Sequence, residues 1–439
     1  MSEKNQNLND GIYDARQLGV PKMLILGLQH TFAMFGATIL VPILTGLPVA
    51  TTLLMAGLGT LLFHLLTKGK VPAFLGSSFA FLGGYAAVAP LLEDGSSNTE
   101  MLPYACGGVF CAGLVYVVMA ALIKAFGARK IMKFFPPVVT GPIIVAIGLI
   151  LAPSAINNCQ TNWIVALVAL VVVIVFNIWG KGMLKIIPII LGVVASYIVG
   201  IAMGEVDFSG FADAKLVGLP PIMIMKFDLS AIITIMPIAL ATMMEHIGDI
   251  TAIGATTGKN YIADPGLHRT LLGDGLATML ASAFGAPANT TYGENTGVLA
   301  LTKIYDPWVV RIAAIFAVIL SFIPKIAFVI ESIPAATIGG VSLILYGMIS
   351  AIGIRNVVEN QVDFTKSRNT IIAALILVCA LGFNATGGIS FGVGSATISL
   401  SGLAIAAIVG IVVNAILPGN EYEFKEEEGT VEKFQTYKL

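Results

Sequence analysis

The sequence predicts an all-α membrane protein that crosses the bilayer many times. Of its 439 residues, 57% are hydrophobic and only 11% are charged, and the mean hydropathy is +0.91. A soluble domain carries about 25% charged residues. Long apolar runs recur between short polar loops, and a helix that spans a bilayer needs about 20 such residues. The expected fold is therefore a bundle of transmembrane helices.

Fourteen apolar segments can be counted along the chain, some of them shorter than a regular span. They are expected near residues 22–46, 51–67, 72–91, 101–126, 136–153, 162–180, 184–204, 228–251, 268–286, 293–303, 308–328, 334–353, 369–383 and 398–417.

The basic residues predict the orientation of these segments. If the N-terminus is cytoplasmic, the loops on that side and both tails hold 21 of the 24 Lys and Arg, and only Lys215, Lys226 and Lys325 lie on the other side. Membrane proteins concentrate Lys and Arg in their cytoplasmic loops. We therefore expect an even number of segments in the inner (cytoplasmic) membrane, with both termini in the cytoplasm. The polar first 20 residues lack the pattern of a removable signal peptide.

Charge and cysteine content argue against several other classes. The net charge is only -1, and the basic residues are spread over many short loops, so no stripe for nucleic acid is expected. The four cysteines, Cys106, Cys111, Cys159 and Cys379, are scattered without a metal-ligand spacing. We expect packing thiols, no metal and no cofactor.

The two halves of the chain echo each other at an offset of about 200 residues, as in transporters built from repeats. Three echoes occur in the same order: Gln29-His30 with Glu245-His246, Ser77-Ser78-Phe79 with Thr290-Thr291-Tyr292, and Pro136, Gly141 and Gly148 with Pro334, Gly339 and Gly347. Each match alone is weak, but three in register favour a repeat. Because seven segments per half is an odd number, the two repeats are expected to be inverted.

Segments three and ten are interrupted at corresponding places, by Gly and Ser at 76–78 with Gly83-Gly84, and by residues 287–293 with Gly297. Unwound backbone at membrane depth is tolerated only where it is buried in protein or lines a cavity. Half-helices that begin near Phe79 and Gly293 would direct free N–H groups and positive dipole ends at a shared point. That point is the predicted binding site.

Three carboxylates lie in this apolar sequence: Glu245, Asp249 and Glu294. Ionisable groups in the membrane are costly and tend to mark a substrate or ion pathway. Glu245 and Asp249 are four residues apart and share one helical face. The alternative is a structural role as partner of Ser, Thr or backbone, and for Asp274 a backbone-binding or capping role is the favoured interpretation.

Backbone N–H donors next to carboxylate acceptors favour a small, flat, uncharged lactam or imide, whereas two nearby carboxylates repel an anion. Phe79 and Tyr292 could supply flat walls for a ring. Burial and mutual repulsion favour a protonated carboxyl group, so proton coupling follows as a hypothesis. Glu245 and Asp249 are its candidates, with His246 as a secondary relay.

Several motifs together resemble one known family, the nucleobase/ascorbate transporters, and within it the bacterial uracil permeases. Residues 294–303, Glu-Asn-Thr-Gly-Val-Leu-Ala-Leu-Thr-Lys, resemble the family signature. Gln29-His30, the run at 76–81, Glu245-His246-Ile-Gly248 and the run at 264–269 also match. The similarity covers residues 15–415.

The resemblance implies a secondary active transporter, not an enzyme, that imports uracil together with protons by alternating access. It implies a core domain (22–126 and 228–328), a gate domain (127–227 and 329–417) and tails at 1–21 and 418–439, with a possible homodimer through the gate. By motif position, Glu245 and Glu294 would bind the pyrimidine, and the backbone at Phe79 and Gly293 would donate to its carbonyls. The implied pocket lining is Ala37 and Tyr292, and the supporting residues are Gln29, His30, Ser78 and Asn295.

Two positions bear on substrate and coupling. Some uracil permeases of the family have histidine where this chain has Asp249, which leaves the proton role of that position open. Xanthine and urate carriers tend to have Gln where this chain has Glu294, so uracil is favoured over a purine. The alternatives are a xanthine or other purine permease, an anion exchanger or channel of the same architecture, and, more remotely, an intramembrane enzyme.

Overall fold

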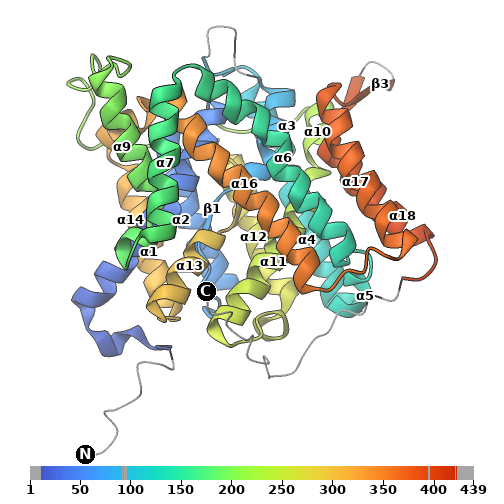
Figure 1. Ribbon diagram of the computed structural model, residues 1–439. Coiled ribbons are helices and arrows are strands. Elements are labelled where there is room, and N and C mark those ends of the chain that lie inside the picture. Colours follow the sequence, from blue (N-terminus) through green and yellow to red (C-terminus); the bar gives the residue numbers. More distant parts are fainter. Residues whose placement is uncertain (1–10, 91, 93–95, 394–395, 421, 423–439) are drawn as a thin grey trace, which may run out of the picture.

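The computed structural model describes residues 11–90, 92, 96–393, 396–420 and 422 (Figure 1). Every one of the fourteen predicted segments contains helix. The helices of the first half are η1 (Ala15–Leu18), α1 (Val20–Thr45), α2 (Val49–Leu66), η2 (Phe79–Phe81), α3 (Leu82–Val88), α4 (Leu102–Phe126), α5 (Ala128–Met132), α6 (Pro137–Gln160), α7 (Trp163–Trp179), α8 (Met183–Ile186) and α9 (Pro188–Ala202).

The second half continues with α10 (Leu229–Ile235), α11 (Ile238–Thr257), η3 (Ile262–Gly266), α12 (Leu267–Ala283), α13 (Gly293–Thr302), α14 (Pro307–Ser321), α15 (Pro324–Glu331), α16 (Ala335–Glu359), α17 (Ser367–Ala385) and α18 (Gly402–Ile416). Two short antiparallel sheets complete the described fold: β1 (Leu75–Ser77) with β2 (Asn289–Thr291), and β3 (Ile389–Val393) with β4 (Ala396–Leu400).

Seven helical stretches in the described residues are long and apolar enough to cross a membrane: α1, α2, α4, α6, α10 with α11, α16 and α17. Shorter apolar helices include α7, α9 and α18. The chain is thus a mostly helical, multi-pass membrane protein, as its composition predicts. The count of fourteen spans stays a prediction, because several of the fourteen segments are shorter than a full span.

Four segments differ in detail from the expected continuous helices. The segment expected at 184–204 is interrupted between α8 and α9, and the segment expected at 228–251 is interrupted between α10 and α11. The segment expected at 308–328 is bent by 87° between α14 and α15. Pro324 lies at the start of α15, where its fixed φ and missing N–H end one helix and begin another. The segment expected at 398–417 begins in strand β4, and its helix starts only at Gly402, where Ser401 accepts a hydrogen bond from the Ala404 amide.

The helices pack in two groups. In the first group α12 packs on α4 and α2, and α14 packs on α2 and α1; in the second α16 packs on α6 and α7, α17 on α6 and α18, and α7 on α9. α6 and α16 run side by side across the middle of Figure 1. A Cβ atom added at Gly148 of α6 would lie 2.1 Å from the Tyr346 carbonyl oxygen of α16, so this approach requires glycine.

Candidate functional site

The two interruptions predicted from the sequence lie side by side and pair as strands. β1 and β2 are antiparallel, with Leu75 opposite Thr291 and Ser77 opposite Asn289. The pairing continues at both ends, where the Ser78 amide donates to the Ala288 carbonyl over 2.8 Å and the Tyr292 amide donates to the Phe74 carbonyl over 3.0 Å. The sheet satisfies the backbone groups that unwinding exposes at membrane depth.

A helix begins directly after each strand. η2 and α3 follow Ser78, and α13 follows Tyr292; neither Ser78 nor Tyr292 caps its helix through its side chain. The first amides of a helix have no partner within it and carry the positive end of the helix dipole. Both helix starts therefore offer N–H donors beside the paired strands. We call the β1–β2 pair together with these two helix starts the crossing.

Tyr292 holds the crossing together. Its hydroxyl donates to the Ser77 carbonyl over 2.9 Å and lies 3.3 Å from the Thr38 hydroxyl of α1. Its ring covers Gly76, where an added Cβ would lie only 2.4 Å from the Tyr292 Cζ atom. The ring is thus fixed between α1 and β1, and the phenol is already hydrogen-bonded within the protein.

A cavity of about 50 Å³ lies at the crossing. Glu245 and Asp249 reach it from α11 and Glu294 from α13. The remaining lining residues are Phe79, Thr290, Thr291, Tyr292, Gly293, and Leu345, Met348 and Ile349 of α16. The cavity therefore lies between the carboxylates of α11 and α13 and apolar side chains of α16.

Phe79 joins the two sides of this cavity. Its ring packs edge-on against that of Tyr346 of α16, with the centroids 5.9 Å apart and the planes at 76°. This is a favourable aromatic geometry. The contact links Phe79, which lines the cavity, to α16, three other residues of which line it as well.

A chain of polar groups runs from the cavity into the protein. The Thr291 hydroxyl donates to Asp249 Oδ2 over 3.0 Å and lies 3.4 Å from His246 Nδ1. His246 Nδ1 in turn lies 3.0 Å from Asp274 Oδ2, and both of these side chains are fully buried. The structure thus places Asp274 beside His246 of α11 and not in the expected backbone-binding role, although neither of its carboxylate oxygens makes a hydrogen bond of good geometry within the described residues.

Several buried polar atoms at the crossing have no hydrogen-bond partner among the described residues. They include Glu245 Oε2, Ser78 Oγ and Thr290 Oγ1. Buried polar groups in proteins are nearly always hydrogen-bonded. Glu245 and Thr290 line the cavity and Ser78 directly precedes Phe79, which also lines it, so a polar ligand would suit this place.

Three of the four supporting residues predicted from the sequence lie on α1 and α13, and the fourth, Ser78, directly precedes η2. Asn295 Nδ2 donates to the His30 carbonyl over 3.1 Å and lies 3.0 Å from His30 Nδ1, which ties the two helices together. Gln29 is half-buried, and its Oε1 is buried without a partner in the described part of the chain. Ala37 is fully buried in α1 next to Thr38, and it is not among the residues that line the cavity.

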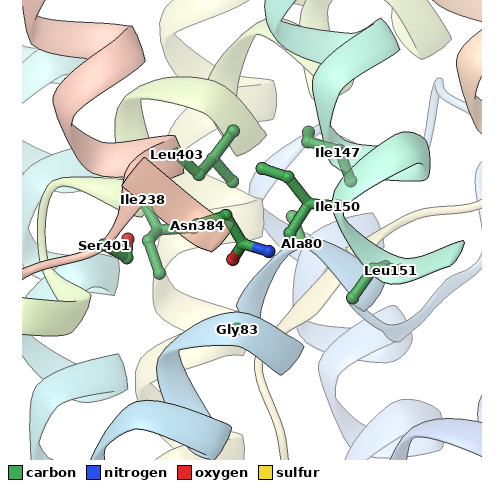
Figure 2. A pocket seen from close by; sticks show the side chains of 9 residues that line it. All are labelled: Ala80, Gly83, Ile147, Ile150, Leu151, Ile238, Asn384, Ser401 and Leu403. Atoms are coloured by element: carbon green, nitrogen blue, oxygen red, sulfur yellow. The ribbon is translucent and has the colours of Figure 1, made fainter. Parts of the chain in front are cut away.

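A second, smaller hollow lies between helices of both halves of the chain (Figure 2). Ala80, Gly83 and Ile238 come from the side of η2, α3 and α11. The opposite side is formed by residues of α6, the end of α17 and the start of α18: Ile147, Ile150, Leu151, Asn384, Ser401 and Leu403. The lining is mainly aliphatic and contains no carboxylate, so this hollow lacks the chemistry of the first cavity.

Comparisons with known proteins agree with the motifs. Residues 21–387 match the model described as "Permease family", of the xanthine and uracil permeases. The chain is 42% identical over 421 residues to the uracil permease of Bacillus caldolyticus, covering 91% of this chain and 93% of the relative. It is 40% identical over 448 residues to the uracil permease of Bacillus subtilis (strain 168), covering 98% of each.

The fold is also similar to a solved structure, the transmembrane domain of the cyanobacterial bicarbonate transporter BicA. The TM-score is 0.61 at 15% identity, over 86% of this chain and 98% of that one. At this identity the similarity shows the fold alone. From the family match and the identity to its relatives, the chain belongs to the nucleobase/ascorbate transporter family, alongside the bacterial uracil permeases.

Proposed function

We propose that this protein is a nucleobase transporter that imports uracil together with protons across the cytoplasmic membrane. The observation that carries the proposal is one cavity at which Glu245, Glu294 and two uncapped helix starts meet. The 40–42% identity to two uracil permeases supports uracil as the substrate. The protein is proposed to be a permease, not an enzyme.

Uracil matches the chemistry of the cavity. Its ring N–H groups would donate to Glu245 and Glu294, which are acceptors when ionised. Its carbonyl oxygens would accept from the backbone N–H groups at Phe79 and Gly293. Glu245 Oε2 is buried without a partner in the described part of the chain, so a bound N–H group would remove an unfavourable state.

The proposed proton path uses the polar chain beside the substrate. Short contacts connect Asp249 to Thr291, Thr291 to His246, and His246 to Asp274. Glu245 lies one turn before Asp249 on the same face of α11. Protonation of one acid would reduce repulsion among the carboxylates as the neutral substrate binds. No cofactor is proposed; the proton is co-transported.

The proposed architecture is fourteen segments in two inverted repeats of seven. The two packing groups support a core domain at 22–126 and 228–328 and a gate domain at 127–227 and 329–417, with cytoplasmic tails at 1–21 and 418–439. Alternating access would then be a movement of one domain against the other, with the cavity and the hollow of Figure 2 at their boundary. A homodimer through the gate domain is part of the proposal.

The test is uptake of labelled uracil into proteoliposomes with and without an inward proton gradient, in competition with excess xanthine. The proposal predicts accumulation that depends on the gradient and resists xanthine. Inhibition by xanthine would indicate a purine carrier instead, and indifference to the gradient would exclude proton coupling. Exchange of labelled bicarbonate without uracil uptake would indicate an anion exchanger.

A further inference from the structure

The first described residues form a link between two parts of the chain that lie far apart in sequence. Ile12 pairs with Ile304 in an isolated parallel β-bridge. The Ile12 amide donates to the Lys303 carbonyl, and the Tyr305 amide donates to the Ile12 carbonyl, both over 2.7 Å. We name residues 12–15 the N-terminal clasp.

Tyr13 of the clasp reaches the end of α11. Its hydroxyl donates to the carbonyl of Thr257, the last residue of that helix. Its ring packs against Tyr305 at 5.3 Å between centroids, and Lys259 Nζ lies 4.4 Å from the centroid of the Tyr13 ring. One side chain therefore contacts both the end of α11 and the segment after α13.

Ala15 completes the clasp. Its amide donates over 2.7 Å to Asp306 Oδ2, while Asp306 Oδ1 accepts from the Trp308 amide and caps α14. Ala15 is fully buried in a small apolar cluster with Leu26, Ile304 and Val309. The clasp is thus packed and hydrogen-bonded on both of its ends.

The two helices that the clasp joins carry the carboxylates of the cavity. Asp249 lies eight residues before the end of α11, and Glu294 lies eight residues before the end of α13. At about 1.5 Å rise per residue, Asp249 and Glu294 each lie about 12 Å along their helix from the C-terminal end that is next to the clasp. A rigid helix transmits a shift at its end to these side chains.

We propose that Tyr13 is a positioning residue, which fixes the spacing of α11 and α13 and so sets the affinity for uracil. The inference rests on the proposed binding role of Glu245 and Glu294. The clasp acts through the two helices, and its residues do not touch the cavity. Loosening it therefore weakens substrate binding more than it slows the transport cycle.

The first experiment measures uracil affinity and uptake kinetics of the full chain with Tyr13→Phe and Tyr13→Ala. Tyr13→Phe keeps the ring contacts and removes one hydrogen bond, so we expect about a 2- to 10-fold rise in Kd and KM. Tyr13→Ala should raise both at least as much, with the maximal rate largely kept. Tyr104→Ala is the matched control, because Tyr104 has a similar contact with Lys226 elsewhere.

A second measurement does not depend on uracil. Spin labels at Ala255→Cys on α11 and Leu301→Cys on α13, in a background without the four native cysteines, report the spacing of the two helix ends. We expect a broader distance distribution in Tyr13→Ala than in the parent protein. Failure of the parent protein to bind uracil would refute the proposed function, while this spacing would still test the clasp.

Unchanged Kd in folded Tyr13→Ala, or an unchanged distance distribution, would overturn the inference. So would an equal loss of affinity in Tyr104→Ala, since that would indicate a general effect of removing an aromatic contact.

Discussion

A methyl group added at Gly76 should disturb the site through Tyr292. The new Cβ would lie 2.4 Å from Tyr292 Cζ and 2.7 Å from Thr38 Oγ1, about 1 Å short of an ordinary contact. The ring cannot easily move away, because its hydroxyl is bonded to Ser77 and Phe74 packs beside it. Such overpacking costs about 1–3 kcal/mol.

Tyr292 directly precedes Gly293 and Glu294, so displacing it moves the start of α13 and one of the two proposed substrate carboxylates. If the whole overpacking energy of about 1–3 kcal/mol is lost from the free energy of uracil binding, Gly76→Ala raises the uracil Kd by about 5- to 150-fold. Gly83→Ala is the matched control, because a Cβ at Gly83 meets nothing within 4 Å. Isothermal titration of both purified variants, with their thermal unfolding midpoints, measures the difference.

Equal uracil affinity in folded Gly76→Ala and Gly83→Ala would refute the reasoning. It would show that the position of Tyr292 does not control the cavity. A loss of affinity in both variants would instead indicate that the whole segment, and not the crossing, is sensitive to substitution.

Three further predictions follow from other parts of the site. Asp249→Asn should flatten the pH dependence of uptake more than it weakens uracil binding, and an unchanged pH profile would remove Asp249 from the proton path. Asn295→Ala leaves the carbonyl and Nδ1 of His30 without the amide donor of Asn295, so the free energy of unfolding should fall by about 1–3 kcal/mol. The control is Thr296→Val, which removes a hydroxyl that has no partner in the described residues and should change the free energy of unfolding by less than about 0.5 kcal/mol. A cysteine at Gly83, which lines the second hollow, should react with a maleimide at a rate that uracil changes, and a constant rate would argue against movement at this boundary.

The meeting of the two interrupted segments could be predicted from the sequence, because glycine-rich breaks at membrane depth need a partner for their backbone groups. The structure provides it as the pairing of β1 with β2. The membrane carboxylates on α11 and α13 could be predicted for the same reason, since the bilayer makes an acid without a role costly. Those residues do line one cavity.

Contacts between distant helices could not be predicted from the same patterns. His246 and Asp274 are separated by 28 positions, and only the packing of α11 near α12 brings them within 3.0 Å. In the sequence, only the presence of an acid, Asp274, inside an apolar segment indicates that this position has a polar neighbour. The β3–β4 hairpin was also missed, because its short apolar run resembles the start of the following helix.

The central claim is that Glu245 and Glu294 bind the substrate at the crossing. The most direct test is a uracil titration of the purified protein and its Glu245→Ala and Glu294→Ala variants, with Glu359→Ala as control because Glu359 is an exposed acid on α16. We predict that uracil binds to the parent protein and to Glu359→Ala, and that neither cavity variant binds it measurably while both unfold at temperatures near that of the parent. Parental affinity in both cavity variants would contradict the account.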